Sequence, residues 1–143
     1  MPDPNATAWE DRLIAEMREN GGKVTSGPLA GHPLLVLTNT GAKSGEKRRA
    51  ILTFHLDKGD YIVAGTAGGS PVEPAWVHNV DVNPDVELEA DDQIFPATAT
   101  VIADGPERDR LWDDHVKELP WFGDYPSQTD RLIPMVRLSR TTR

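Results

Sequence analysis

Residues 34–56 read LLVLTNTGAKSGEKRRAILTFHL, and this stretch organises the chain. Its two ends, residues 34–40 and 50–56, are apolar runs that predict two strands. The turn between them, residues 41–49, carries four of the chain's 15 basic residues and one acid, Glu46. Its local charge is about +3 (4 − 1), whereas the whole chain has a formal charge of −8. A cationic turn on an acidic protein suggests a docking point for an anion.

The chemistry of the turn supports that hypothesis. Gly41 and Gly45 permit positive φ angles, so that backbone N–H groups can turn inward as a nest. Lys43 and Arg48 add positive charge, and Ser44 adds a hydroxyl donor. The alternative, a charged hairpin loop that binds nothing, stays open. The turn is not a Walker A loop, because Ala42 and Leu37 stand where that motif needs glycines.

Composition limits the function classes. The 143 residues suit a single domain, 1–143, in which 1–26 form an N-terminal arm and helix and 33–139 the core. No apolar run reaches membrane-spanning length and the N-terminus does not resemble a signal peptide, so a cytoplasmic location is the default. The absence of cysteine excludes disulfides and thiol nucleophiles. The acidic balance argues against nucleic-acid binding.

The rest of the chain supplies further strands and a few helices. A capping box at Thr7 predicts a helix over 8–20, with an apolar stripe formed by Trp9, Leu13, Ile14 and Met17. That stripe packs on the core or, alternatively, covers a pocket or touches a membrane surface. Helices are also predicted over 74–80 and 105–119, an aromatic loop over 121–126, and strands over 61–66, 86–90, 94–103 and 133–138.

The expected fold class is mainly β (α+β). Short turns between the segments of 34–66 predict an antiparallel meander. About six strands with two or three peripheral helices favour a small β-barrel.

Motifs for several chemistries are missing. The four histidines show no metal-ligand spacing, so no metal site is predicted. Neither Gly-x-Ser-x-Gly nor Gly-x-Gly-x-x-Gly occurs, and Ser44 has no adjacent base. Four features remain: the basic turn, the Gly68-Gly69 break, Trp76 with His78-Asn79, and the late aromatic loop. Together they suit a planar cofactor with a phosphate tail, although Trp76 also suits a core and Asn79 a helix end.

Several blocks in one order carry a family resemblance. They are Thr38-Asn39-Thr40-Gly41-Ala42-Lys43-Ser44-Gly45 with Arg48, Thr66-Ala67-Gly68-Gly69, Pro74-Ala75-Trp76-Val77-His78-Asn79, and Thr129-Asp130-Arg131-Leu132-Ile133-Pro134. The chain resembles the deazaflavin-dependent nitroreductase family, which consists of split β-barrel oxidoreductases that use coenzyme F-420. The resemblance implies hydride transfer from the reduced cofactor to a small hydrophobic acceptor such as a quinone, enone or nitro compound.

The resemblance also implies roles for individual residues. The acidic tail of the cofactor should meet Ala42, Lys43, Ser44 and Arg48. The cofactor should border Arg49, Ala50, Ile51, Leu52 and Thr53, and its ring should lie along Ala64, Gly65, Thr66 and Ala67. Ala75, Trp76, Val77, His78 and Asn79 should cap it. Leu119, Phe122 and Tyr125 should face the substrate, with Tyr125 as the catalytic proton donor.

Some positions depart from the family pattern. Ala42 and Ala67 replace an arginine and a lysine, and Arg49 is expected to compensate for one lost contact. Leu119 and Phe122 replace tyrosines, which favours an apolar substrate pocket. An FMN-dependent enzyme of the same barrel class and a non-catalytic module that binds a cofactor or lipid remain as alternatives. The oligomeric state and a peripheral membrane contact of the N-terminal helix stay open.

Overall fold

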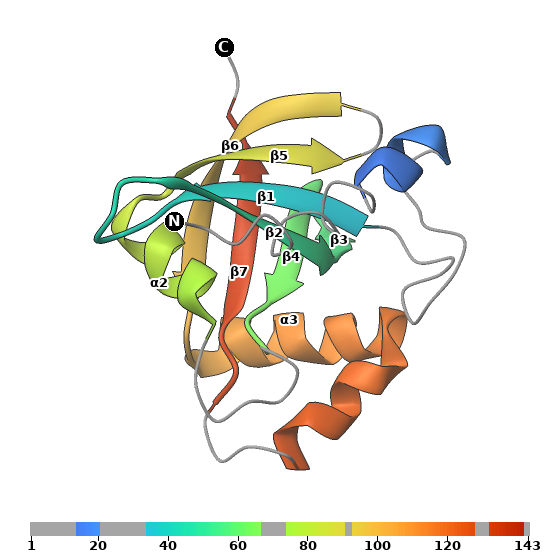
Figure 1. The fold of residues 1–143 in the computed structure, drawn as a ribbon. Coiled ribbons are helices and arrows are strands. Elements are labelled where there is room, and N and C mark those ends of the chain that lie inside the picture. Colours follow the sequence, from blue (N-terminus) through green and yellow to red (C-terminus); the bar gives the residue numbers. More distant parts are fainter. Residues whose placement is uncertain (1–13, 21–33, 67–73, 91–92, 128–131, 142–143) are drawn as a thin grey trace.

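The computed structural model describes residues 14–20, 34–66, 74–90, 93–127 and 132–141 (Figure 1). A helical segment, 14–19, precedes the sheet. The elements that follow are β1 (Leu34–Thr40), β2 (Lys47–Thr53), β3 (His55–Asp57), β4 (Asp60–Ala64), α2 (Ala75–Val82), β5 (Asp85–Ala90), β6 (Gln93–Ile102), α3 (Gly105–Glu118), the 3-10 helix η2 (Pro120–Ser127) and β7 (Met135–Arg140).

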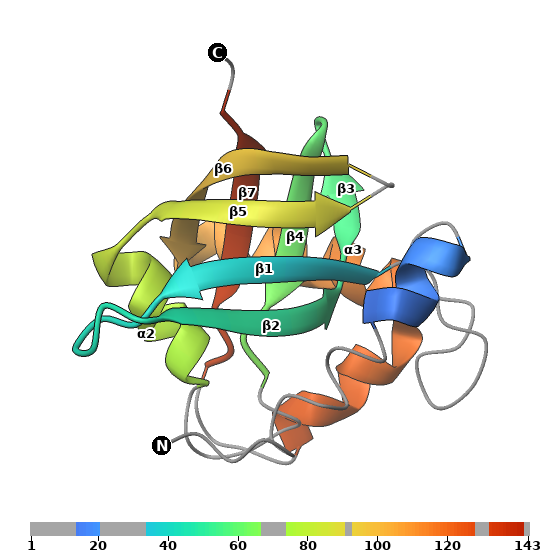
Figure 2. The same cartoon turned by 45° about the horizontal axis from the view of Figure 1, so that its top comes forward.

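The described strands form one antiparallel sheet of seven strands in the order β2-β1-β5-β6-β7-β4-β3. Its two edge strands, β2 and β3, are consecutive in the chain and are separated by Phe54 alone. A one-residue connection spans only a few ångströms, so the two edges must approach each other and the sheet must curl. Figures 1 and 2 show the resulting barrel-like layer with helices around it.

Two expectations about the strands are corrected. The predicted strand over 50–56 is broken at Phe54, which gives seven described strands in place of about six. The predicted meander of β1 to β4 is wrong, because the β1–β2 and β3–β4 hairpins lie at opposite edges of the sheet. The break at Phe54 is the physical reason: its buried side chain packs into the core, and the chain changes direction there. The aromatic loop expected over 121–126 is the 3-10 helix η2.

The alternation of strand residues separates an inner core from two outer ones. The inner core contains Leu35 and Leu37 of β1, Leu88 of β5 and Leu138 of β7. On the outside, α3 and η2 cover β4 and β7 through a second cluster that includes Leu111. The curled sheet is therefore packed on both faces over much of its area, which explains how so short a chain builds a core.

The N-terminal helical segment covers the outer face of β1. Ile14 and Met17 are buried against Leu34 and Val36, so core packing is confirmed for these two members of the predicted stripe. A bidentate Arg18–Glu89 pair at 2.7 and 2.8 Å ties the segment to β5. Figures 1 and 2 place the segment at the end of β1 away from the β1–β2 turn. The Thr7 capping box, Trp9 and Leu13 lie outside the described residues.

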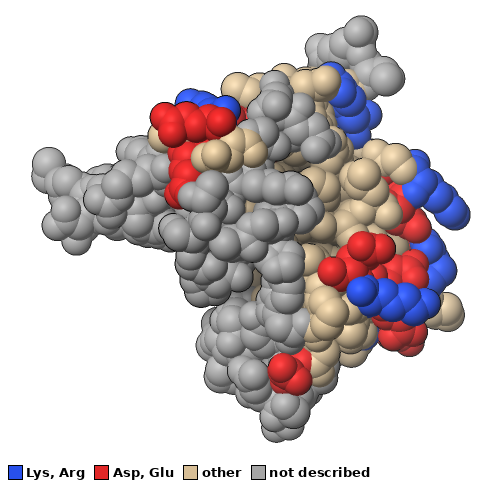
Figure 3. Space-filling model, turned by 90° about the vertical axis from the view of Figure 1, so that its right-hand side faces the viewer, with Lys and Arg blue, Asp and Glu red and all other residues tan. Residues whose placement is uncertain are grey.

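A charge cluster fastens the β3–β4 hairpin to the rest of the fold. Asp57 accepts hydrogen bonds from Arg110 of α3 at 2.9 and 3.1 Å and from Arg137 of β7 at 2.7 Å. These guanidinium groups hold the pKa of the Asp57 carboxyl well below its usual range. Figure 3 shows acidic and basic side chains interleaved on the face that it draws, without a continuous basic surface. Within the described ranges, no helix has the length and apolar character needed to cross a membrane.

A buried histidine pair joins β3 to α3. The Nδ1 atoms of His55 and His115 lie 2.7 Å apart, so one ring donates its proton to the other. His115 is fully buried and its ring meets Phe122 edge-on. Both Nε2 atoms are buried, and neither has a hydrogen-bond partner in the part of the chain that the structure describes. Burial lowers the pKa of both rings, and the neighbouring His55 helps to bring that of His115 to about 3.

The histidine pair predicts a loss of stability in acid. Below the ordinary histidine pKa of about 6.5 the unfolded chain binds protons that the folded pair refuses. The free energy of unfolding should therefore fall as the pH drops from about 6.5 toward 3, by up to roughly 1.4 kcal/mol per pH unit for each ring. Denaturant unfolding of the wild type and of H55L/H115L at several pH values measures the difference in slope.

The exposed histidine His78 provides the control, because H78Q removes an imidazole ring that is not buried in the core. In H78Q the free energy of unfolding should depend on pH as steeply as in the wild type, whereas in H55L/H115L it should depend on pH less steeply. If the free energy of unfolding of H55L/H115L and of the wild type fell equally between pH 7 and 4, the predicted effect of the histidine pair would be contradicted.

Candidate functional site

The β1–β2 turn has a closed internal structure. The Gly41 N–H donates to the carbonyl of Glu46 at 2.8 Å, and the Gly45 N–H donates to the carbonyl of Gly41 at 2.9 Å. Gly45 has a φ of 71°, a value that favours glycine. A Cβ at Gly41 would lie 2.5 Å from Ser44 Oγ, so the turn closes only with glycine there or with Ser44 displaced. Of the two glycines, only Gly45 uses the positive φ that the sequence suggested; Gly41 does not have a positive φ and instead leaves room for Ser44.

One face of α2 lies against the turn. Val77 and Val80 are buried toward the sheet, so Ala75, His78 and Asn79 share the opposite side of the helix by their three- and four-residue spacing. Asn79 Oδ1 accepts a hydrogen bond from the Ala42 N–H at 3.0 Å. This bond holds the turn beside the helix, and Figures 1 and 2 show the two elements side by side.

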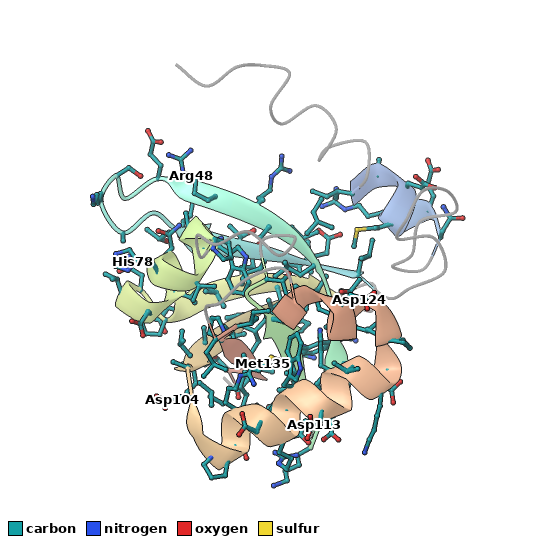
Figure 4. The ribbon with its side chains drawn as sticks, turned by 90° about the horizontal axis from the view of Figure 1, so that it is seen from below. Arg48, His78, Asp104, Asp113, Asp124 and Met135 are labelled. Carbon is teal, nitrogen blue, oxygen red and sulfur yellow. The ribbon has the colours of Figure 1, made fainter. Side chains whose placement is uncertain are left out.

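The turn and the helix enclose a groove of about 330 Å³. The residues that line it are Gly41, Ala42, Lys43, Ser44, Arg48, Ala75, His78 and Asn79. Figure 4 shows Arg48 and His78 at the same end of the molecule, with Asp113 and Asp124 away from them beside α3 and η2. A volume of this size accommodates part of a cofactor.

The donors of the groove suit an oxyanion. Of the N–H groups of residues 41–46, all of which the structure describes, those of Lys43 and Ser44 have no hydrogen-bond partner. Ser44 Oγ accepts a bond from the Glu46 N–H at 3.1 Å, which leaves the hydroxyl proton of Ser44 available to donate. The Lys43 side chain is exposed and carries a charge. Two amides, a hydroxyl and an ammonium group therefore offer hydrogen bonds to the groove.

Arg48 is already in contact with an acid. Its Nη2 lies 3.2 Å from Glu46 Oε2, and both side chains are more than half exposed. Exposed pairs of this kind contribute little stability because water and salt screen them. An incoming anion can therefore replace Glu46 at a small cost, and Glu46 competes with that anion for Arg48.

The structure brings together seven of the predicted cofactor residues: Ala42, Lys43, Ser44, Arg48, Ala75, His78 and Asn79. The β2 residues 49–53 do not form one wall, since alternate side chains of a strand face opposite ways. Ala50 and Leu52 pack on the inner core, whereas Ile51 packs on the outer cluster with Ile14 and Met17. Arg49 alternates with Arg48, so it does not replace the missing arginine in the groove, and Thr53 is buried.

The predicted ring contacts have other roles in the described structure. Ala64 and Thr66 are buried, and a Cβ at Gly65 would lie 2.7 Å from Val77 Cγ2. Gly65 thus allows α2 to approach the end of β4. Trp76 packs against the inner core and Val77 is buried. Ala67 and the Gly68-Gly69 break lie outside the described residues.

The predicted substrate residues lie near α3. Leu119 and Phe122 are 2% and 6% exposed and pack with Leu111 and Trp112. Both side chains therefore pack in a core, and their expected contact with the substrate stays a prediction. The backbone of Tyr125 lies in η2, and its side chain is outside what the structure describes.

Sequence reasoning missed two residues that shape the groove. The sequence indicates Gly41 only as a boundary of the turn, but the lack of a Cβ at this residue leaves room for Ser44. Asn39 was quoted only as part of a motif, yet its side chain is 1% exposed and hydrogen-bonded to Asn79 at 2.9 Å. The signal for Asn39 was present, since it follows Leu35 and Leu37 at the two-residue spacing of an inward-facing row.

The sequence and fold match known proteins. A family model for F420H(2)-dependent quinone reductases matches residues 10–140. The chain is 36% identical over 110 residues to the F420H(2)-dependent quinone reductase Rv1261c of Mycobacterium tuberculosis, covering 76% of this chain and 74% of that protein. It is also 34% identical over 106 residues to the putative F420H(2)-dependent quinone reductase Rv3178 of the same organism, covering 74% and 88%.

Solved structures agree with these matches. A structure described as an F420-H2 dependent reductase (FDR-A) is 37% identical, with a TM-score of 0.68, over 75% of this chain and 94% of that chain. A second, described as a domain-swapped dimer, is 32% identical, with a TM-score of 0.70, over 94% and 99%. The haem storage protein HutZ of Vibrio cholerae, 17% identical with a TM-score of 0.53, shares the fold alone. The expected split β-barrel fold is confirmed.

The geometry of the turn predicts different effects for two glycine substitutions. G41A should displace Ser44, break its bond to the Glu46 N–H and weaken anion binding, because the new Cβ would overlap Ser44 Oγ. G45A meets no atom within 4 Å and should cost about 1–2 kcal/mol through its positive φ alone. Phosphate titration followed by NMR shifts of residues 41–48 measures binding, and thermal unfolding measures stability.

The comparison of the two variants is the control. G45A should retain more of the phosphate response than G41A at a similar loss of stability. Equal phosphate responses in G41A and the wild type would show that the placement of Ser44 does not matter.

Proposed function

The chain belongs to the F420H(2)-dependent quinone reductase family, and from that premise we propose that the groove between the β1–β2 turn and α2 binds the acidic tail of reduced coenzyme F-420. The protein is accordingly an oxidoreductase. When bound, the reduced deazaflavin supplies a hydride to a quinone-type acceptor. The residues of the chain bind the tail, orient the cofactor and exclude water.

The observation that carries the proposal is the set of groove donors. Lys43 and Arg48 supply two positive charges, and the free N–H groups of Lys43 and Ser44 with the Ser44 hydroxyl supply hydrogen bonds. This donor set fits the phosphate and carboxylate groups of an anionic tail. The site lies on a protein whose overall charge is −8, so the attraction is local to this turn.

The opposite wall suits the body of the cofactor. The α2 side of the groove presents Ala75 and His78, where a flat ligand can pass between helix and turn. Tight binding of the tail would position the reactive ring and so lower the entropic part of the barrier. Tyr125, whose backbone lies in η2, remains the proposed proton donor on the strength of the family resemblance.

The alternatives carried from the sequence rank lower. The missing cations at positions 42 and 67 favour FMN, but the family model, Rv1261c and the FDR-A structure are all named for F420. Competition between F-420 and FMN for the purified protein compares the two cofactors directly. A non-catalytic module is excluded if reduced F-420 is oxidised in the presence of a quinone such as menadione.

Removing the two cations should weaken cofactor binding in a salt-dependent way. We expect K43A/R48A to raise the Kd for F-420 by roughly 10- to 100-fold, since each charge-assisted hydrogen bond contributes about 1.5–3 kcal/mol before screening. Fluorescence titration of F-420 at low and high salt measures the Kd, and the difference between variants should shrink at high salt.

The matched control is K58A/K117A, which removes the same net charge from exposed positions outside the groove. It should bind F-420 like the wild type. Equal losses in both double variants would mean that net charge, and not the turn, governs binding. No binding to the wild type at tens of micromolar F-420 would refute the proposed function.

The Glu46–Arg48 pair predicts a gain in affinity. E46Q should lower the Kd for F-420 by roughly two- to fivefold, because it removes an acid that competes for Arg48 at a cost of about 0.2–1 kcal/mol. D113N, which removes a charge from the exposed face of α3, is the control and should leave the Kd unchanged. A Kd for E46Q equal to or higher than that of the wild type would contradict the competition.

A further inference from the structure

A continuous line of hydrogen bonds crosses from the turn to the sheet. The Ala42 N–H donates to Asn79 Oδ1 at 3.0 Å, and Asn79 Nδ2 donates to Asn39 Oδ1 at 2.9 Å. Asn39 Nδ2 in turn donates to the carbonyl oxygens of Arg48 at 3.2 Å and Leu37 at 3.4 Å. Two side-chain amides therefore connect the turn, α2, β1 and β2.

The chemistry at both ends fixes the orientation of the two amides. The Ala42 N–H can only donate, so it requires the oxygen of Asn79. The carbonyls of Arg48 and Leu37 can only accept, so they require the nitrogen of Asn39. The remaining contact, from Asn79 Nδ2 to Asn39 Oδ1, then has the correct polarity. Every member of the line is satisfied in one arrangement, which favours a single rigid geometry.

Asn39 stands at a position where an apolar side chain would be expected. Leu35, Leu37 and Asn39 form the inward row of β1, and Asn39 pairs in register with Arg48 of β2. It is 1% exposed. Burying an amide in such a row costs free energy unless its hydrogen bonds are made, and an apolar residue would avoid that cost. An amide has a role at this position because α2 and the turn meet the sheet there, and the amide of Asn39 hydrogen-bonds to both Asn79 and the Arg48 carbonyl.

We propose that Asn39 is a positioning residue that sets the distance between the β1–β2 turn and α2, and thereby the shape of the anion groove. It acts through Asn79, whose amide oxygen and nitrogen are both engaged within the protein. Asn79 is therefore a second positioning residue, although the family resemblance had suggested a direct cofactor contact. The identity of the ligand in this inference rests on the proposed function.

Loss of Asn39 would propagate to the groove donors. Asn79 Nδ2 would lose its acceptor, and the Asn79 side chain would be free to leave the Ala42 N–H. Ala42 precedes Lys43 and Ser44, whose N–H groups have no hydrogen-bond partner among the described residues. A second link from α2 to β1, from Asn83 Nδ2 to the carbonyl of Thr40, is longer at 3.5 Å and does not reach the turn.

A double-mutant cycle on affinity tests the link. We expect N39A and N79A each to raise the Kd for F-420 about tenfold, the effect of losing one to two hydrogen bonds. The double variant N39A/N79A should bind no more than about threefold worse than either single variant, because residues of one network are not additive. N83A, which truncates the longer link, is the control and should bind like the wild type.

Steady-state kinetics separates positioning from catalysis. In N39A the KM for reduced F-420 should rise with the loss of affinity, whereas kcat at saturating cofactor should change less than threefold. The proposal would be overturned if kcat of N39A fell by a larger factor than its KM rose, or if N39A bound F-420 with the wild-type Kd. It would also be overturned if the Kd change of N39A/N79A equalled the product of the two single changes.

Amide hydrogen exchange of Ala42 tests the same link without any ligand. In N39A, and in N39S if N39A does not fold, the Ala42 N–H should exchange at least tenfold faster than in the wild type, while core amides such as that of Leu37 keep their protection. Unchanged exchange at Ala42 would refute the link. If wild-type protein failed to bind F-420 but Ala42 exchange responded to N39S, the proposed function would fail and the positioning role of Asn39 would stand.

Discussion

A single residue, Phe54, separates two strands that lie at opposite edges of the sheet. That short connection forces the seven-stranded sheet to curl. Curling turns one face of each strand into an enclosed interior, so that alternate residues of β1 and β5 meet in the inner core. It also presents a convex outer face, which α3, η2 and the helical segment 14–19 cover in two separate places. The helix α2 differs, because its Val80 and Trp76 pack on the inner core.

The groove exists because the turn closes on itself and then rests on a helix. The N–H groups of Gly41, Ala42, Gly45 and Glu46 are used within the protein, which leaves those of Lys43 and Ser44 for a ligand. The positive charge of the turn is concentrated where these donors lie, although the chain as a whole is acidic. The proposed binding of an anionic cofactor tail would thus depend on local geometry more than on net charge.

Residues from the motifs of the family have different structural roles in this chain. Leu119 and Phe122 occupy positions associated with substrate, yet in this chain they are apolar and complete the core beneath α3. Asn39 and Asn79 show the reverse case, since they are polar and hydrogen-bonded where the inner core ends. In both cases the side chain suits what surrounds it, because an unpaired amide in a core is costly and an apolar side chain there is not.

The sequence by itself determined the local features of this protein. The alternation of residues 34–40 and the ordered motifs predicted the strands and the family, and the glycine-bounded cationic turn led to the proposed anion site, because each depends on neighbouring residues. Only the tertiary structure decided which strands pair, that β2 and β3 form opposite edges, that Arg49 and Ile51 face away from the groove, and that Asn39 reaches Asn79 forty positions later. Those features depend on contacts between residues far apart in the chain, which local sequence patterns do not specify.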